Sequence, residues 1–560
     1  MKKKGKLRVE FPGAMLLVVA LLGIWHYQDV REGAAACGDL WLGRIYLVLA
    51  AAVLASIFVL GRGLLGNSQK KIWGRSVRLE RIYPVAGLLL GLLYLFVLPP
   101  LSAPDEISHY VSAYQLSSHM LGQPSNDRYG RVLLRTEDAW VEDMEGIREY
   151  ETDEDGNLQA TKESAQGNVK LGEVLDESMY QTLWELGISG QYMPQRLDSM
   201  RGSYVSSQYP PVVTTPLAYV PAAVGISAAR LLGMTTVPLL YMGRLCNLMF
   251  FVLMTCLAMR RLPFGKEVLF GVALLPMTLH LSASFSYDVM ILGCMFCFTA
   301  VCLDLAYQKK QVSWRDVLVL MVLMAVSGPC KIVYAVLMGL CLLIPVRKFG
   351  GWGKWALAAL AVGGAWAVSM YLVNSQVIVS YATETESYVQ WAGEPGYSLT
   401  LLLHQPLRLV KMFYQTLLWQ AEHYHLTMIG ASLGNLDKVL DVPYLAVVVF
   451  TLCLLELAFR KPGETLRMGG GQRAWVCVVC AGCAAVTMAS MLIAWTPVSS
   501  KVINGVQGRY FLPFLPVLLM ALKNDTVVLT KDRNRSILYL MCCLNGYVLL
   551  RLFSIVCLRL

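Results

Sequence analysis

The stretch IYPVAGLLLGLLYLFVLPPLSAPDEISHYVSAYQL, residues 82–116, decides the fold class. Residues 82–101 are almost entirely apolar, and an α-helix needs about 20 such residues to cross the hydrocarbon core of a bilayer. The chain then turns polar at the adjacent carboxylates Asp105 and Glu106. This pattern predicts a membrane-spanning helix that ends in a loop at the membrane surface.

The rest of the chain has the same apolar character. Of its 560 residues, 56% are hydrophobic and 15% are charged, whereas soluble domains carry roughly 25% charged residues. This composition excludes a soluble multidomain protein, a disordered chain and a disulfide-stapled secreted scaffold. Further apolar runs lie near residues 11–25, 40–60, 211–231, 238–258, 267–283, 287–306, 316–330, 332–346, 352–373, 443–459, 474–494, 509–522 and 536–557. The sequence therefore predicts an all-α polytopic membrane protein.

The charges predict how the chain is oriented. Residues 102–208 carry 19 acidic and 8 basic residues, whereas the remainder carries 40 basic and 19 acidic residues. Short cytoplasmic loops of membrane proteins are enriched in Lys and Arg, so the acidic segment is expected outside. The basic clusters all fall inside if residues 211–231 lie on the membrane surface, and Pro211, Pro216 and Pro221 suit such a broken helix. We therefore predict 13 spans, a cytoplasmic N-terminus and an outer C-terminus, although a crossing 211–231 segment stays an alternative.

Four parts of the chain are expected. They are an N-terminal two-helix membrane extension (1–81), a membrane core (82–373) that includes the outer loop 102–237, a second outer segment (374–442), and C-terminal membrane helices (443–560). Cysteines such as Cys477 and Cys480 lie in apolar runs among small residues, which favours helix packing over metal binding.

The start of the outer loop offers the first candidate site. Pro104 suits the first turn of a helix, which would place Asp105 and His109 on one face. A structural alternative is a capping box between Ser102 and Asp105. However, a pair of carboxylates beside a histidine at the bilayer boundary is costly to bury and well placed to meet a substrate.

Charged residues on other runs are expected at the same depth. Asp288 with Tyr287 ends the fifth predicted span, Lys331 follows Gly328-Pro329-Cys330 between two short runs, and Arg509 with Tyr510 opens a later run. Arg244 lies just inside another run. Each cation alone could snorkel to the interface or cap a helix, but together they fit an anionic lipid headgroup bound beside a carboxylate.

Other motifs carry less information. His423 and His425 stand two residues apart, which places them on different sides of a helix, so an interfacial helix is the better interpretation. The sequence contains no H-E-x-x-H or G-x-x-x-x-G-K-[ST] motif. Zinc-protease and ATP-driven functions therefore lack support.

Several motifs in order give the chain a family resemblance. They are Ala103-Pro-Asp-Glu-x-x-His109-x-x-x-Ala113-Tyr114, Tyr209-Pro-Pro211, Tyr241-x-Gly-Arg244-Leu-x-Asn247, Pro276-Met277 with Ser286-Tyr-Asp288, Lys331 with Tyr334, and Gly508-Arg-Tyr-Phe-Leu-Pro513. Over roughly residues 80–525 the chain resembles the bacterial predicted-membrane-protein family catalogued as domain of unknown function twenty-one forty-two, which is grouped with the GT-C glycosyltransferases. Protein O-mannosyltransferases and aminoarabinose transferases belong to the same superfamily.

The resemblance implies a GT-C fold and a glycosyltransferase in the bacterial plasma membrane. Such enzymes take a sugar from a polyprenyl-phosphate carrier and place it on a glycan, lipid or protein acceptor at the outer face. Asp105 would be the catalytic base, with Glu106 as a supporting acid or as a ligand, with Asp105, of a divalent cation (Mg²⁺ or Mn²⁺), and with His109 beside them. Lys331, Arg509, Tyr510 and Arg244 would bind the donor phosphate, and the candidates for the substrate pocket are Tyr114, Tyr209 and Asp288. No nucleic-acid partner is expected.

These residue types suit that reaction. A polyprenyl phosphate is a good leaving group that needs cations, whereas an acceptor hydroxyl needs a carboxylate base. Single displacement would invert the sugar carbon. The alternatives are a transporter or flippase for a lipid-linked glycan, which also needs interfacial charges, and a non-catalytic assembly subunit.

Overall fold

The computed structural model describes most of the chain. The described residues are 11–36, 41–66, 78–142, 150–152, 158–160, 170–172, 175, 179–180, 183, 202–383, 388–398, 404–435 and 440–558. The acidic stretch 137–155, expected within the outer loop, therefore lies partly outside the described residues.

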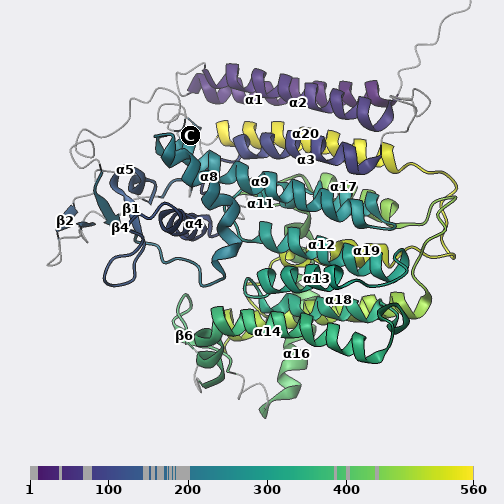
Figure 1. The fold of residues 1–560 in the computed structure, drawn as a ribbon. Helices are drawn as coiled ribbons and strands as arrows, with labels where there is room; N and C mark the ends of the chain where they lie inside the picture. Colours follow the sequence, from purple (N-terminus) through teal and green to yellow (C-terminus); the bar gives the residue numbers. More distant parts are fainter. Residues whose placement is uncertain are drawn as a thin grey trace, which may run out of the picture.

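Long apolar helices form the body of the molecule and lie side by side (Figure 1). Eight of them are long and apolar enough to cross a membrane: α1 (Phe11–Ala36), α2 (Trp41–Leu65), α3 (Leu79–Val97), α9 (Thr236–Arg261), α12 (Asp288–Tyr307), residues Trp352–Ser375 of α14 (Trp352–Thr383), α18 (Gly470–Trp495) and α20 (Asn534–Leu558). The prediction of a helical polytopic membrane protein is confirmed. The first helix continues well beyond residue 25, where the apolar run ends.

The other predicted spans are short or broken helices. They correspond to the pair α10 (Lys266–Ala273) and α11 (Pro276–Ser282), to α13 (Trp314–Ser327), to the 3₁₀ helix η4 (Ile332–Leu343), to α17 (Tyr444–Ala458), and to the pair η6 (Gly508–Phe511) and α19 (Leu515–Met520). A 3₁₀ helix rises about 2.0 Å per residue instead of 1.5 Å, so η4 reaches farther than an α-helix of equal length. The total of 13 spans stays a prediction.

The loops gather at two opposite ends of the helices (Figure 1). At one end, Lys523 contacts Glu267 at 2.8 Å and Glu464 at 3.0 Å, and Lys348 donates hydrogen bonds to the carbonyls at the end of α12. We call this the basic-loop end, because the basic clusters between the spans lie here. The other end holds the described part of residues 102–208, and we call it the acidic-loop end.

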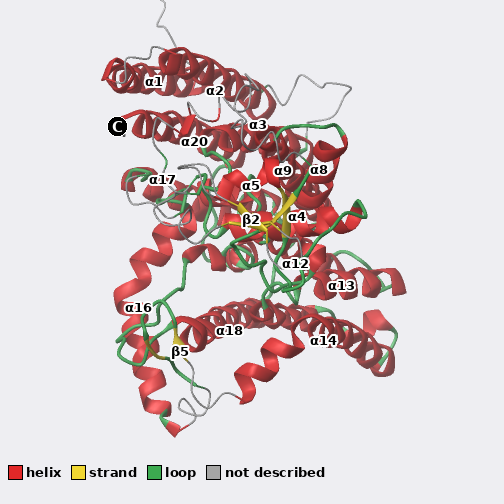
Figure 2. Cartoon of the chain, turned by 90° about the vertical axis from the view of Figure 1, so that its left-hand side faces the viewer, coloured by secondary structure: helices red, strands yellow, loops and turns green. Residues whose placement is uncertain are grey.

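The acidic-loop end carries a small layer of its own. Helix α4 (Glu106–Met120) is seen end-on in Figure 1, perpendicular to the spanning helices, which is the orientation of a helix lying along a membrane surface. Figure 2 views this end, with α4 and β2 near the centre and α16 at one side. The remaining elements are β1 (Leu133–Arg135), α5 (Thr136–Ala139), η1 (Trp140–Glu142), β2 (Tyr150–Thr152), β3 (Leu158–Ala160), β4 (Tyr204–Ser206), β5 (Tyr388–Val389), β6 (Glu394–Pro395), α16 (Pro406–Ile429) and, at the basic-loop end, η5 (Val346–Phe349).

A four-stranded sheet was not expected from the sequence. Its strand order is β1-β4-β3-β2, with Leu134 opposite Val205 in the antiparallel β1–β4 pair and Leu158 opposite Val205 in the parallel β3–β4 contact. These strands have three residues each, so they leave little periodicity to detect. The all-α description therefore holds for the membrane body and not for this loop.

The segment that was expected on the membrane surface starts and ends beside α4. It forms η3 (Pro216–Tyr219) and α8 (Val220–Leu231). Before it, the Val212 amide donates to the Ser112 hydroxyl at 2.8 Å, and at its end Arg230 donates to Ser117 at 3.2 Å. Because both contacts lie on α4, the geometry favours the interfacial alternative over a crossing helix.

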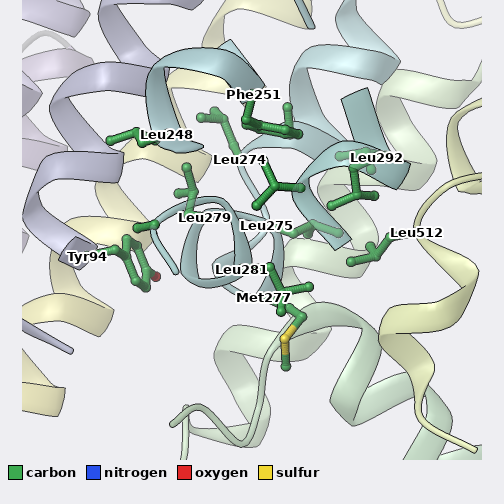
Figure 3. Packing of buried hydrophobic residues seen from close by; sticks show 14 of the residues in the cluster. Tyr94, Leu248, Phe251, Leu274, Leu275, Met277, Leu279, Leu281, Leu292 and Leu512 are labelled. Atoms are coloured by element: carbon green, nitrogen blue, oxygen red, sulfur yellow. The ribbon is translucent and has the colours of Figure 1, made fainter. Parts of the chain in front are cut away.

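The core of the membrane body is built around a broken helix. Residues 274 and 275 separate α10 from α11, and apolar side chains from α3, α9 and α12 surround this break (Figure 3). The break leaves the Leu274 carbonyl without a helical partner, but the Asn545 amide of α20 donates to it at 2.9 Å. The Asn545 side-chain oxygen in turn accepts from the Tyr94 hydroxyl at 2.9 Å. In an apolar interior such freed backbone groups need partners.

The two ends of the sequence meet in the fold. Helix α20 lies beside α1, α2 and α3 (Figure 1), and small residues allow close contact, since a Cβ on Gly33 would lie 2.2 Å from the Cys557 carbonyl oxygen. The predicted N-terminal extension thus packs on a helix from the predicted C-terminal part.

Candidate functional site

Three charged residues from separate elements meet at the acidic-loop end. Asp288 begins α12, Lys331 lies in the turn between α13 and η4, and Arg509 lies in η6. The Asp288 carboxylate is 3.5 Å from the Lys331 ammonium and 3.8 Å from the Arg509 Nε. All three side chains are at least four-fifths buried. The structure therefore brings together three residues that the sequence placed at one depth.

Aromatic side chains surround these charges. The Lys331 ammonium lies 3.7 Å from the centre of the Tyr510 ring and 5.4 Å from that of Tyr287, within the range of cation–π attraction. The Tyr334 hydroxyl donates to the Tyr510 carbonyl at 3.0 Å, which ties η4 to η6. Tyr287 and Tyr334 were noted in the sequence only as neighbours of Asp288 and Lys331.

His109 of α4 completes the group, and we call His109, Asp288, Lys331, Arg509 and Tyr510 the charged cluster. Its ring packs edge-on against Tyr287 with centres 4.8 Å apart, and its Nδ1 lies 2.7 Å from the Tyr219 hydroxyl. Burial lowers the pKa of His109 to about 3, so the ring is neutral at neutral pH. His109 therefore adds a polar contact without adding charge.

The charged cluster has more positive than negative charge. Burial alone would lower the pKa of Lys331, but the Asp288 carboxylate raises it above its ordinary value. Arg509 carries a guanidinium group, which stays protonated in proteins, and its Nε lies 3.8 Å from the same carboxylate. Two permanent cations therefore share one buried carboxylate.

Arg509 also has unused hydrogen-bonding capacity. Its Nε and Nη1 are buried and make no hydrogen bond within the described part of the chain. A buried, unsatisfied guanidinium group is costly, and its planar fork matches phosphate or carboxylate oxygens. The charged cluster is therefore suited to bind an anion.

Asp105 lies beside this cluster in an unusual backbone conformation. It precedes α4 with φ at 56°, and its side chain is exposed and makes no capping hydrogen bond. Leu101 and Asp105 are the only non-glycine residues at positive φ within the described ranges. The alternative of a capping box between Ser102 and Asp105 is therefore wrong. Helix α4 begins at Glu106, so Pro104 is not in its first turn and Asp105 does not share a helical face with His109. Strained backbone of this kind occurs often at functional sites.

Glu106 and Arg244 have a different environment from the one expected. One Glu106 oxygen accepts from the Ala103 amide and the other from the Phe285 amide, both at 2.9 Å. The Arg244 Nε lies 3.5 Å from Glu106, and both side chains are fully buried. Arg244 also donates to the carbonyls of Ala283 and Leu98. Because these groups are already satisfied, the geometry favours a structural role, and we leave both residues out of the proposed chemistry.

The donor set does not fit a metal at Asp105 and Glu106. Both Glu106 oxygens accept backbone amides, which leaves Asp105 as the single carboxylate that is open to solvent. No group of three His, Cys, Asp or Glu residues suited to a metal occurs among the residues that the structure describes. We therefore assign no step to a divalent cation.

Two of the three substrate-pocket candidates, Tyr114 and Tyr209, have partners outside the charged cluster. The buried Tyr114 hydroxyl donates to Asp138 at 2.7 Å, and the Arg230 guanidinium lies over its ring. Tyr209 precedes η3 and is half-buried, with the Lys170 ammonium 5.7 Å from its ring centre. Tyr114 holds the outer loop on α4, and Asp288 is the pocket candidate that belongs to the charged cluster.

Tyr219 lies beside the charged cluster, and the sequence did not single it out. It comes from η3, 110 positions after His109, its hydrogen-bond partner. The proline-rich entry to η3 was the only signal near it.

The spanning helices and the buried charges at their ends define a polytopic membrane protein with a candidate anion-binding site. The sequence matches the family described as "Predicted membrane protein (DUF2142)" over residues 88–518, well over half of the chain. The chain belongs to this family. No curated protein and no solved structure gives a match.

Proposed function

We propose that this protein is a membrane glycosyltransferase of the GT-C type. It would transfer a sugar from a polyprenyl-phosphate donor to a glycan, lipid or protein acceptor at the acidic-loop end, which would face outward from a bacterial plasma membrane. The observation that carries the proposal is the pair of cations, Lys331 and Arg509, held around Asp288 with two Arg509 nitrogens unsatisfied.

The cations would serve the leaving group. As the bond between the sugar carbon and the phosphate oxygen breaks, negative charge builds up on the phosphate. Lys331 and Arg509 are buried, and electrostatic stabilisation is stronger where water is scarce. Asp288 would hold both cations in position without neutralising them completely.

Asp105 would serve the acceptor. Asp105 is exposed, and its backbone carbonyl accepts from the His109 amide at 3.3 Å, which places it one helical turn from a member of the charged cluster. It would accept the proton of the acceptor hydroxyl while the hydroxyl oxygen bonds to the sugar carbon from the side opposite the leaving phosphate. This single displacement would invert the sugar carbon and release polyprenyl phosphate.

The proposal is tested by transfer of radiolabelled sugar from defined polyprenyl-phosphate donors in proteoliposomes. Asp105→Asn should reduce transfer by roughly 10²–10⁴-fold, since an amide cannot accept the proton, while thermal stability changes little. Glu422→Gln, at an exposed carboxylate of α16, is a matched control that should keep full activity.

Two results would contradict this assignment. Normal transfer by folded Asp105→Asn protein would remove Asp105 as the base. Movement of intact lipid-linked sugar across the bilayer without transfer would instead favour the transporter or flippase alternative.

A further inference from the structure

A charged cavity lies at the basic-loop end, opposite the charged cluster. It has a volume of about 420 Å³ and lies between the starts of α3 and α10 and the ends of α9 and α12. Cavities of 300–1,000 Å³ are typical of ligand sites. Its lining includes four cations and one carboxylate: Arg78, Arg81, Arg260, Lys266 and Glu80.

The single carboxylate does not balance these cations. Glu80 lies 3.5 Å from the Lys266 ammonium and 3.9 Å from Arg78. Arg81 and Arg260 form no ion pair within the described part of the chain. Unpaired like charges around a concave site repel one another, and a bound anion would relieve that repulsion.

The backbone adds to the positive potential. Helix α10 begins at Lys266, and its N-cap residue Gly265 has φ at 73° and no side chain to cap the first amides. The one carboxylate in its first turn, Glu267, is paired with Lys523 at 2.8 Å. The N-terminal end of a helix carries a partial positive charge and attracts anions. This helix end and the arginines thus favour the same kind of ligand.

The position of the cavity points to a lipid. Helices α3, α9 and α12 are membrane-spanning by length and composition, so a cavity at their ends lies at the depth of the phospholipid headgroups. An adjoining cavity of about 460 Å³ shares Arg78, Glu80 and Lys266. Its lining also holds Glu267 and Glu464, which are paired with Lys523, and the apolar side chains of Leu79, Phe264 and Leu466. These apolar side chains suit the glycerol and acyl part of a lipid whose phosphate lies among the cations.

We propose that this cavity binds the phosphate headgroup of an anionic phospholipid. Its cations bind the phosphate, and the apolar side chains of the adjoining cavity, Leu79, Phe264 and Leu466, contact the upper part of the lipid. The site is independent of the proposed transfer reaction, because it lies at the other end of the spanning helices.

The test uses the full chain in nanodiscs of phosphatidylcholine, with or without phosphatidylglycerol. Thermal unfolding and native mass spectrometry measure stabilisation and retained anionic lipid. Each basic residue near a membrane surface contributes about 1 kcal/mol to anionic-lipid binding, so Arg81→Gln/Arg260→Gln should weaken retention roughly thirtyfold. Lys310→Gln/Arg315→Gln changes two exposed cations at the same end outside the cavity and should retain the lipid as the unmodified chain does.

The controls distinguish the lipid from a soluble anion. Inorganic phosphate and ATP, added to phosphatidylcholine nanodiscs, should give no stabilisation that depends on Arg81 and Arg260. Equal lipid retention by both double variants would overturn the site. Stabilisation by ATP or phosphate that the Arg81→Gln/Arg260→Gln change removes would overturn the lipid as its occupant.

Discussion

Asp105 and Glu106 are neighbours in the sequence with opposite environments. Asp105 is exposed at positive φ, whereas Glu106 is enclosed with Arg244 and accepts two backbone amides. Because a buried ion pair that loses one partner leaves an uncompensated charge, the two carboxylates should respond differently to the same chemical change.

Replacing Glu106 tests its structural role. Glu106→Gln should lower the free energy of unfolding by about 3–5 kcal/mol, since Arg244 would keep its charge without a counter-ion. Denaturant unfolding in detergent micelles measures this change, with Asp105→Asn as the matched carboxylate-to-amide control. Equal stability of the two variants would contradict the structural assignment of Glu106.

Replacing the cations tests the anion site. Lys331→Ala and Arg509→Ala should each reduce use of the lipid-linked donor roughly ten- to hundredfold, because a charge-assisted contact to phosphate is worth about 1.5–3 kcal/mol. Donor-dependence curves in proteoliposomes measure the effect. Lys501→Ala, at an exposed lysine of the loop before η6, should leave donor use unchanged. Unaltered donor dependence in both cluster variants would remove Lys331 and Arg509 from the site.

The sequence predicted part of this site for a physical reason. Three members of the charged cluster lie at the borders of apolar runs: Asp288, Lys331 and Arg509. Their depth in the membrane could therefore be inferred from hydropathy alone. The role of Arg244 could not, because its pairing with Glu106 depends on a contact between residues 138 positions apart. Hydropathy gives the depth of a charge but not its partner.

At the scale of elements, apolar runs located the helices but not their breaks. The run 267–283 forms two short helices because Pro276 starts a new helix after an interruption. Its freed Leu274 carbonyl is satisfied by Asn545 from a helix about 270 residues later in the chain. That pairing is a tertiary contact, which explains why Asn545 could not be recognised as important from its own apolar run.

Asn545 should therefore hold the broken helix in place. Asn545→Leu leaves the Leu274 carbonyl and the Tyr94 hydroxyl buried without partners, and each costs about 1–3 kcal/mol of unfolding free energy. Tyr94→Phe removes only the hydroxyl and should cost less. A double-mutant cycle in detergent micelles should show that the two losses are less than additive. Independent, additive effects would contradict the proposed link between α20 and the break.

At the scale of the whole molecule, the loops sort by charge to two ends. The described part of the acidic loop lies with α4 at one end, while residues such as Lys348 and Lys523 pack at the other. The positive-inside tendency then predicts that the basic-loop end is cytoplasmic. The structure shows which loops share an end of the molecule. Which of the two ends faces the cytoplasm is inferred from the charges alone.

Labelling with a membrane-impermeant maleimide tests that direction in intact cells. A cysteine at Tyr129, an exposed residue of the acidic loop, should react from outside, whereas one at the exposed Lys310 should react only after the membrane is permeabilised. The unmodified chain measures the background, which should be low because most of the described cysteines are buried. Labelling of Lys310→Cys in intact cells, with protection of Tyr129→Cys, would reverse the proposed orientation. The charged cluster would then face the cytoplasm, and an outer-face transfer reaction at Asp105 would be excluded.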